Sequence, residues 1–265
     1  MVIPFTKAHG TGNDFIILFS KDVPLLKITD SFIKNICNRH TGVGADGVLL
    51  ISQHENFDFK MDYYNNDGSW ETMCANGARC AVLFMYKRGL IKKHCLFLAG
   101  DGPHKSEVID GSNVKIKMSP PKFCDKPVNI CGFKGRHVDS GAQHFVVPVD
   151  SFSKINAFSL GKKMRYSKHF SPKGINVNFF KKIGSNSIQV LTYEKGVERI
   201  MMSCGSGSVA SAFYASILTQ ISSGVIIQVS GGSLSLDFDS GWRNVWLSGA
   251  AILLFNSSLL IEDLQ

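Results

Sequence analysis

Two stretches of the chain lie 130 residues apart and share one pattern: Cys74-Ala-Asn-Gly-Ala-Arg-Cys80 and Cys204-Gly-Ser-Gly-Ser-Val-Ala210. In each, small residues follow the cysteine and lead into a largely apolar run, Ala81–Met85 or Ser211–Ala215. This pattern is typical of a cysteine at the N-terminus of a buried helix, where the helix dipole and unpaired N–H groups favour a thiolate or a bound anion. The pair predicts one site with a thiol on either side of a substrate.

The same offset of 130 residues relates further segments of the two halves. It places Phe15-Ile-Ile on Phe145-Val-Val and Tyr63 on Tyr193, and it slips by one only near the end of each half. We interpret these matches as an internal duplication of half-length units. The alternative is that glycine turns recur independently along an ordinary α/β chain.

Strand and turn patterns dominate the chain, and few segments have helical periodicity. Ser119-Pro120-Pro121 interrupts them just before the second half begins, so the predicted domains are 1–118 with 250–265, and 119–249. The segment from Ala250 onward has no visible counterpart in the first half and is expected to pair back with it. Helices are predicted at Ile28–Asn38, 75–88 and 205–219, and strands at Asp14–Phe19, Val48–Ser52, Phe57–Tyr63, Val114–Met118, Phe145–Val149, Ile188–Tyr193 and Ile226–Val229.

Composition predicts a soluble globular protein, with 44% apolar and 19% charged residues. The net charge of +8 comes from lysines scattered in pairs, without a nucleic-acid-binding signature, so we expect solvated surface charge that also suits an anionic substrate. The start of the chain lacks a signal-peptide pattern, and the longest apolar stretch is too short to span a bilayer. We therefore expect a cytoplasmic protein with reduced thiols that binds neither membrane nor nucleic acid.

Seven motifs occur in the order and spacing of one known family, from about residue 5 to about residue 255, so the chain resembles the diaminopimelate epimerases. The resemblance implies an α+β fold of two pseudo-symmetric domains, each a curved, mostly antiparallel sheet wrapped around a central helix. It also implies an epimerase that interconverts LL- and meso-diaminopimelate without a cofactor or metal. The motifs are His9-Gly-Thr-Gly-Asn13-Asp-Phe, Gly42-Val-Gly-Ala-Asp46-Gly, Tyr64-Asn65-Asn-Asp-Gly-Ser69, Cys74-Ala-Asn76-Gly77-Ala-Arg-Cys80, Asn176-Val-Asn-Phe, Tyr193-Glu194-Lys195-Gly196 and Cys204-Gly205-Ser206-Gly207.

The chemistry also follows from the residues. Inversion of an α-carbon requires a base on one face and an acid on the other, and Cys74 and Cys204 would fill these roles, one as thiolate and one as thiol. Because an unperturbed thiol has a pKa of about 8.5, the base needs help from its surroundings, such as a helix N-terminus. The same helix ends would offer backbone N–H groups to the substrate carboxylate.

The remaining site residues are assigned by the resemblance. His144 is expected to assist Cys74, and Glu194 to assist Cys204 and contact the substrate. Taken alone, a histidine is more often structural, a strand-end glutamate is solvated, and an asparagine beside glycine or aspartate is a turn residue. The predicted substrate-binding residues are Asn13, Asn65, Ala75, Asn76, Asn176, Glu194, Lys195, Gly205 and Ser206.

Four departures from the family pattern concern the substrate. Lys195 stands where the family has the arginine that holds the distal carboxylate, and lysine lacks the planar fork that grips a carboxylate with two bonds. Ala142, Ala75 and Ile200-Met201 also differ. Three hypotheses follow: a diaminopimelate epimerase, a racemase or epimerase of another amino acid such as glutamate or histidine, and a binding protein that has lost catalysis. The expected partner is a small-molecule amino acid, with a homodimer as a candidate assembly.

The other five cysteines have simpler interpretations. Cys37, Cys80 and Cys95 lie in apolar or helical contexts and are predicted to be small core residues. Cys124 and Cys131 are spaced too widely for a Cys-x-x-Cys metal or redox pair.

Overall fold

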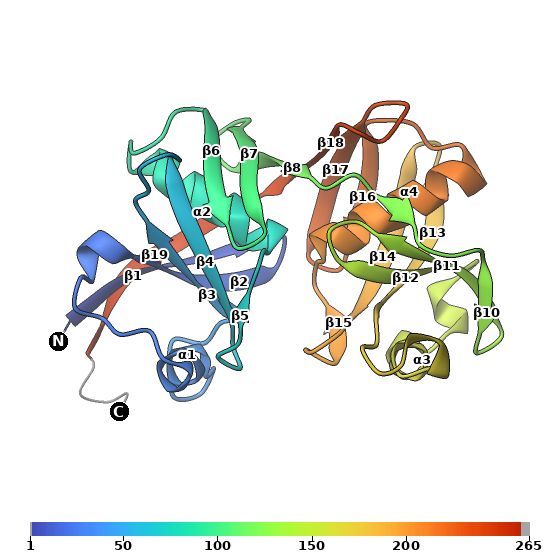
Figure 1. The fold of residues 1–265 in the computed structure, drawn as a ribbon, viewed down its shortest axis with the longest axis horizontal. Helices are drawn as coiled ribbons and strands as arrows, with labels where there is room; N and C mark the ends of the chain where they lie inside the picture. The colour runs from blue at the N-terminus through green and yellow to red at the C-terminus, as the bar shows by residue number, and fades with distance from the viewer. Residues whose placement is uncertain (1, 261–265) are drawn as a thin grey trace. The chain divides into compact units, whose positions relative to one another are not determined.

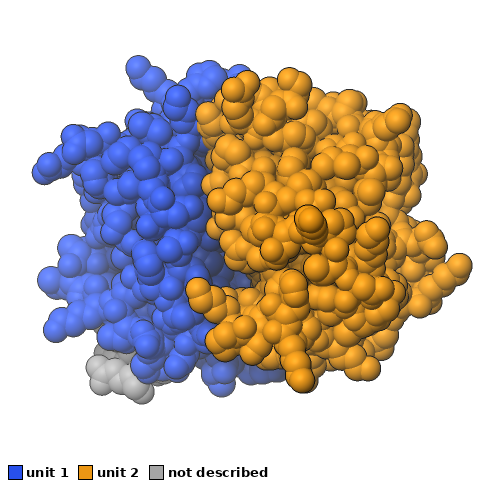
Figure 2. Space-filling view, turned by 45° about the vertical axis from the view of Figure 1, so that its right-hand side comes forward, with its two compact units in different colours: residues 1–116, 249–265 blue, residues 117–248 orange. Residues whose placement is uncertain are grey.

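The computed structural model describes residues 2–260, so Met1 and residues 261–265 of the predicted N-terminal half lie outside the described residues. The chain divides into two compact units (Figure 2). Unit 1 comprises residues 1–116 and 249–265, and unit 2 comprises residues 117–248. No helix within residues 2–260 has the length and apolar character needed to cross a membrane.

Unit 1 is a mixed, mostly antiparallel sheet with the strand order β19-β1-β2-β3-β4-β6-β7-β8. Its two parallel pairs, β2–β3 and β4–β6, each need a crossover, which contains α1 in the first case and α2 in the second. The elements are β1 Val2–Gly10, β2 Asn13–Phe19, α1 Asp30–Cys37, β3 Gly47–Ser52, β4 Phe59–Asn65, β5 Trp70–Glu71, α2 Ala75–Lys87, β6 His94–Ala99, β7 Gly102–Val108, β8 Asn113–Met118 and β19 Ile252–Leu260.

Unit 2 repeats this order, which confirms the predicted pseudo-symmetric fold class. Phe15 pairs with Gly47 in the parallel β2–β3 ladder, and Phe145 pairs with Val177 in the parallel β12–β13 ladder, in the same register. The elements are β9 Lys122–Phe123, β10 Val128–Ile130, β11 Phe133–Asp139, β12 Gln143–Pro148, α3 Ala157–Arg165, β13 Asn176–Gly184, β14 Ser187–Glu194, β15 Arg199–Met201, α4 Gly205–Thr219, β16 Val225–Val229, β17 Gly232–Phe238 and β18 Val245–Ala250.

The last strand of the chain, β19, pairs antiparallel with the first, β1, as the sequence predicted (Figure 1). Its equivalent in the duplicated fold lies in unit 2 and not at the end of the first half. In unit 2 the two-residue strand β9 pairs antiparallel with β11. Ile252 lies opposite His9, and Lys122 lies opposite Asp139, so the two pairings share one register under the offset of 130. A strand of two residues is too short to produce a sequence pattern.

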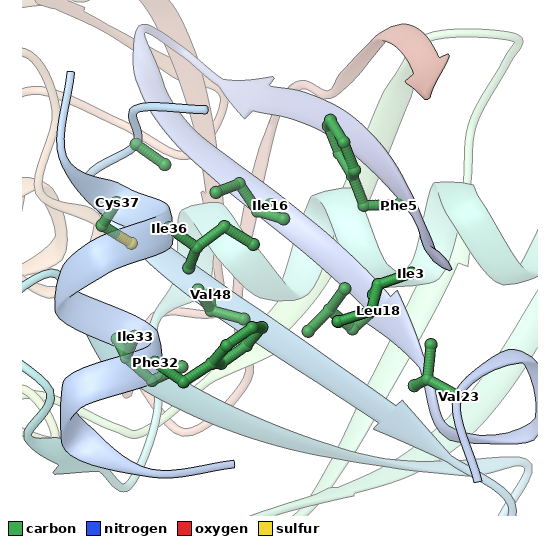
Figure 3. Close-up of a cluster of buried hydrophobic side chains, with 11 residues drawn as sticks. Ile3, Phe5, Ile16, Leu18, Val23, Phe32, Ile33, Ile36, Cys37 and Val48 are labelled. Atoms are coloured by element: carbon green, nitrogen blue, oxygen red, sulfur yellow. The ribbon is translucent and has the colours of Figure 1, made fainter. Parts of the chain in front are cut away.

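The sheet of unit 1 is covered on both faces. Its outer face packs against α1, where Phe32 and Ile36 meet Ile16 and Val48 in a buried cluster (Figure 3). Thr29 caps this helix, because its side chain accepts the N–H of Phe32 at 3.1 Å. The other face wraps around α2, in which every residue from 75 to 85 is buried. Helix α2 is therefore buried almost all round at the centre of unit 1, and its N-terminus lies within the fold.

The strand predictions and the two cysteine helices are confirmed to within two residues, whereas α3 was missed. Only Gly161, Met164 and Arg165 of this nine-residue helix are buried, so its apolar periodicity is weak. The available signal was Asn156, whose side chain caps the helix by accepting the N–H of Ser159 at 3.0 Å.

Candidate active site

The two cysteines occupy the same backbone position in the two units. Cys74 is the N-cap of α2 with φ −134° and ψ 113°, and Cys204 is the N-cap of α4 with φ −134° and ψ 114°. Neither side chain caps its own helix. Each sulfur is thus carried at the positive end of a buried helix, as the sequence predicted.

Glycines explain why the first turn of each helix lies so close to its sheet. A Cβ on Gly77 would lie 2.8 Å from Leu49 Cδ2, and a Cβ on Gly207 would lie 2.3 Å from Asn178 Nδ2. Both contacts are closer than real Cβ atoms make. Because of the Cys-x-x-Gly spacing, each cysteine lies three residues before the glycine at which its helix packs closely against the sheet.

The Cys74 thiol faces an asparagine whose orientation is fixed. Cys74 Sγ donates to Asn13 Oδ1 at 3.7 Å, and Asn76 Nδ2 donates to the same oxygen at 3.1 Å. On the other side, Asn13 Nδ2 donates to Asp46 Oδ2 at 2.9 Å. Because an ionised carboxylate only accepts hydrogen bonds, Asp46 must face the amide NH₂, which leaves the amide oxygen towards the thiol. Asn13 therefore presents an acceptor suited to a thiol or to a substrate ammonium group.

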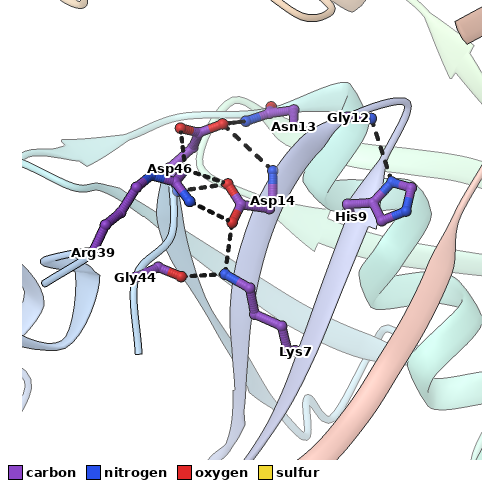
Figure 4. A network of polar contacts seen from close by, with 8 residues as sticks. All are labelled: Lys7, His9, Gly12, Asn13, Asp14, Arg39, Gly44 and Asp46. Atoms are coloured by element: carbon purple, nitrogen blue, oxygen red, sulfur yellow. Dashed lines mark hydrogen bonds and ion pairs between the residues drawn. The ribbon is translucent and has the colours of Figure 1, made fainter. Parts of the chain in front are cut away.

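A network of ion pairs holds Asp46 in place (Figure 4). Arg39 donates to Asp46 at 3.0 Å and to both oxygens of Asp14 at 2.7 and 3.1 Å. Lys7 donates to Asp14 at 2.6 Å and to the carbonyl of Gly44. Burial raises the pKa of Asp14, but the hydrogen bonds and charges of Arg39 and Lys7 outweigh it and lower the pKa to about 2. The carboxylates of Asp14 and Asp46 are thus both paired with cations at neutral pH.

Cys204 rests as a thiol. Its burial and the neighbouring carboxylate of Glu194 raise its pKa well above the ordinary thiol value, and Glu194 accepts its hydrogen bond. The N–H of Gly207 acts in the opposite direction without reversing the shift. This cysteine therefore stays a thiol at its helix N-terminus, because loss of water and the negative charge of Glu194 disfavour the charged form.

His144 is a buried, neutral histidine next to the N-terminus of α4. Its Nδ1 lies 2.8 Å from Asn178 Oδ1, and its Nε2 lies 3.0 Å from the Ser206 hydroxyl. Asn178 donates its NH₂ to Thr192 at 2.7 Å, so its oxygen faces the ring and Nδ1 carries the proton. Burial lowers the pKa of His144 to about 4, against the opposing bond from Asn178. Nε2 is then an acceptor for Ser206.

The sequence model of the family described as diaminopimelate epimerase matches residues 5–124 and 136–251, which is most of the chain. The chain belongs to the diaminopimelate epimerase family. It is 37% identical to a diaminopimelate epimerase of Aquifex aeolicus (strain VF5), across 98% of this chain and 99% of that protein. It is 33% identical to a diaminopimelate epimerase of Archaeoglobus fulgidus, across 100% and 99%.

Solved structures with the same fold have little sequence in common with this family member. A PhzF-family phenazine biosynthesis protein of Bacillus anthracis has a TM-score of 0.73 at 14% identity, covering 98% of this chain and all of that one. A probable proline racemase of Agrobacterium radiobacter K84 has a TM-score of 0.72 at 14% identity, covering 98% and 93%. These likenesses establish the fold alone.

The remaining motif residues of the diaminopimelate epimerase family divide between the units. Unit 1 carries Asn65, whose oxygen accepts the Tyr63 hydroxyl at 2.5 Å. In unit 2, Asn176 accepts the backbone N–H of Lys195 at 2.8 Å and thereby holds the turn after Glu194. The predicted residues in the unit of Cys74 are Asn13, Asn65, Ala75 and Asn76, and those in the unit of Cys204 are His144, Asn176, Glu194, Lys195, Gly205 and Ser206.

The roles of these residues in substrate binding stay predictions. The assistance of Cys74 by His144 also stays a prediction, since the contacts of His144 within its own unit are to Asn178 and Ser206. Sequence reasoning missed two residues that orient the site, Asp46 and Asn178, although both lie inside quoted motifs. It also missed Arg79, for which the signal was an arginine between Ala78 and Cys80 in an otherwise apolar helix.

Proposed function

We propose that this protein epimerises LL-diaminopimelate to meso-diaminopimelate in the cytoplasm, without a cofactor, by moving the α-proton between Cys74 and Cys204. The proposal is supported by family membership across nearly the whole chain. It is also supported by the matching N-cap geometry of the two cysteines, one in each unit, which is the observation that carries the chemistry.

Each step uses atoms that the units supply. In one direction the substrate Cα–H bond breaks, the proton passes to the Cys74 sulfur, and the electron pair stays on the carbon and spreads into the carboxylate. Backbone N–H groups at the first turns of α2 and α4 stabilise that charge with dipoles that are already oriented. The Cys204 thiol then gives its proton to the opposite face of the carbon, and the reverse reaction exchanges the two roles.

Loss of either thiol tests this mechanism. We expect Cys74→Ala and Cys204→Ala each to lower kcat by at least about 10²- to 10⁴-fold, because a positioned acid or base contributes that much. The measurement is exchange of the α-proton of LL-diaminopimelate in deuterated buffer, followed by NMR. Cys124→Ala removes an exposed thiol and serves as the control that keeps full activity. Full turnover by either single active-site variant contradicts the two-thiol mechanism.

A second candidate is the same chemistry on another amino acid. Its motivation is Lys195, which is exposed and forms no ion pair within residues 2–260. A screen of diaminopimelate, glutamate and histidine for α-proton exchange separates the two candidates. Exchange confined to glutamate or histidine favours this second function, and exchange of diaminopimelate by the native protein favours the first.

A further inference from the structure

Arg79 is a buried cation that the proposed chemistry has not used. It lies one turn into α2 and is 0% exposed, which makes it the largest fully buried side chain of the described residues. A guanidinium remains protonated at neutral pH even though burial lowers its pKa, because its ordinary pKa lies above about 12. A full positive charge therefore sits inside unit 1, and buried charges need partners of opposite sign.

The neighbours of Arg79 are neutral. Its Nη2 donates to Asn76 Oδ1 at 2.9 Å and to Thr11 Oγ1 at 3.0 Å, and Nη1 reaches the carbonyl of Ala75 at 3.4 Å. Its Nε has no hydrogen-bond partner among the described residues. The ionisable groups whose charges act on Arg79 are the thiols of Cys80 and Cys74.

Of these two thiols, only Cys74 is suited to ionise. Burial raises the pKa of Cys80 to about 12 despite the nearby arginine, so it stays neutral. Cys74 is only partly buried and stands at the N-terminus of α2. Arg79 is also close to it along the helix, since Arg79 Nη2 donates to Asn76 Oδ1 in the first turn of α2, two residues after Cys74.

Most of the other charged or titratable groups on the strands that pack against α2 have partners of their own, and the rest are exposed or neutral. In β1 and β2, Lys7 and Asp14 pair with each other, and His9 Nδ1 accepts the N–H of Gly12. In β4 and β7, Asp62 pairs with Lys60, His104 with Asp101, and Glu107 with Lys115. The Tyr63 hydroxyl donates to Asn65. Burial raises the pKa of Tyr64, so its hydroxyl stays neutral. Lys105 lies exposed on β7.

The second unit has no equivalent cation. The offset of 130 places Arg79 on Val209, an apolar residue that is 0% exposed. The charged neighbour of Cys204 is the carboxylate of Glu194, which disfavours a second negative charge. The two cysteines therefore share backbone geometry but lie in environments of opposite sign.

We propose that Arg79 is the positioning residue that holds Cys74 as the thiolate in the substrate-free protein, so that Cys74 is the resting base and Cys204 the resting acid. Asn13 Oδ1 accepts from the Cys74 thiol, so this contact favours the thiol form and is lost on ionisation; the charge of Arg79 has to outweigh it. The sulfur is then stabilised by the N–H groups at the start of α2 and by the Arg79 charge behind them. The catalytic meaning of this assignment rests on the proposed function, but the ionisation itself can be measured without substrate.

The test is the pH dependence of alkylation at Cys74. Folded full-length protein is given a short pulse of iodoacetamide from about pH 5 to about pH 10, and mass spectrometry with fragmentation that separates Cys74 from Cys80 gives the rate at each pH. We expect native Cys74 to titrate below the free-thiol value of about 8.5. In Arg79→Met the midpoint rises by about one unit or more, so the rate at neutral pH falls about tenfold, and Arg79→Lys restores part of it.

Two controls separate this effect from misfolding. Arg88→Met removes an exposed arginine at the end of the same helix, one that pairs with Asp22, and leaves the Cys74 profile unchanged. Exposed Cys124 reports reagent activity in every sample. A native Cys74 that titrates at or above the free-thiol value overturns the proposal even if Arg79→Met does not fold, and so does an unchanged profile in a folded Arg79→Met. Failure to turn over diaminopimelate affects only the proposed function.

Discussion

At the scale of single residues, the site depends on the direction in which one amide points. Asn13 is 4% exposed, and Asp46, which holds its NH₂, lies 33 positions away in the sequence. Rotation of that amide by half a turn would turn its NH₂ towards the Cys74 thiol and Asn76 Nδ2, where its oxygen now accepts from both. The role of Asp46 is thus to fix the orientation of a neighbouring amide.

Asp46→Asn tests this role. The new side chain can donate as well as accept, so Asn13 is no longer held in one orientation. A lost hydrogen bond to a charged group is worth about 1.5–3 kcal/mol, so we expect kcat/KM for diaminopimelate to fall about 10- to 100-fold. Asp62→Asn, which removes a carboxylate paired with Lys60, is the matched control. Native kcat/KM in a folded Asp46→Asn protein would show that the amide is oriented by other contacts.

At the scale of elements, the decisive feature is the close approach of each central helix to its own sheet. The first turn of α4 lies against β13 and β14 through Gly207, Asn178 and Thr192. Ser140 Oγ donates to the carbonyl of Ser206 at 2.8 Å, which ties the same turn to the end of β11. The N–H groups in the first turn of α4 are thereby held in place by packing within unit 2.

Gly207→Ala should destabilise unit 2, although alanine is the better helix former. Its Cβ would lie 2.3 Å from Asn178 Nδ2 and 3.2 Å from Thr192 Oγ1, and overpacking of this kind costs about 1–3 kcal/mol. The free energy of unfolding from urea titration measures the effect. Gly111→Ala, where the nearest atom to the new Cβ is Lys87 Nζ at 3.8 Å, should change stability little. Equal stabilities of the two variants would contradict the packing argument.

At the scale of the whole molecule, the buried histidine couples stability to pH. The pKa of His144 is lowered to about 4 by burial, whereas an unfolded histidine has a pKa of about 6.5. Between these values the unfolded chain binds the extra proton, so stability is full above about pH 6.5 and is lost as the pH falls towards 4. Asp14, with its pKa lowered from 3.8 to about 2, loses its contribution only at still lower pH.

We therefore expect the free energy of unfolding of unit 2 to fall by about 3 kcal/mol between pH 6.5 and pH 4. Tryptophan fluorescence in a Trp70→Phe background follows this unit, because the other two tryptophans, Trp242 and Trp246, lie within residues 117–248. His144→Gln, which cannot take up a proton, should show a shallower dependence. The same slope in both proteins would assign the acid sensitivity to other groups.

Local patterns in the sequence were sufficient for the elements that carry the chemistry. Small residues after each cysteine, followed by an apolar run, predicted both helix starts, and β-branched or aromatic runs bounded by turn residues predicted seven of the strands within two positions. The duplication was visible at one offset because Phe15 and Phe145 hold equivalent positions in the two parallel ladders. These features depend on neighbours within a few positions along the chain, so the sequence by itself determined them.

Only the tertiary structure decided the charge environment of the site and the pairing of β9 with β11. The pairing of Asp46 with Asn13 and the opposition of β9 to β11 join residues of separate elements, which no local pattern relates. The neutral surroundings of Arg79, and the thiol state of Cys204 beside Glu194, depend on which groups folding removes from water. Desolvation and long-range pairing are properties of packed neighbours, and a linear sequence does not state which residues those will be.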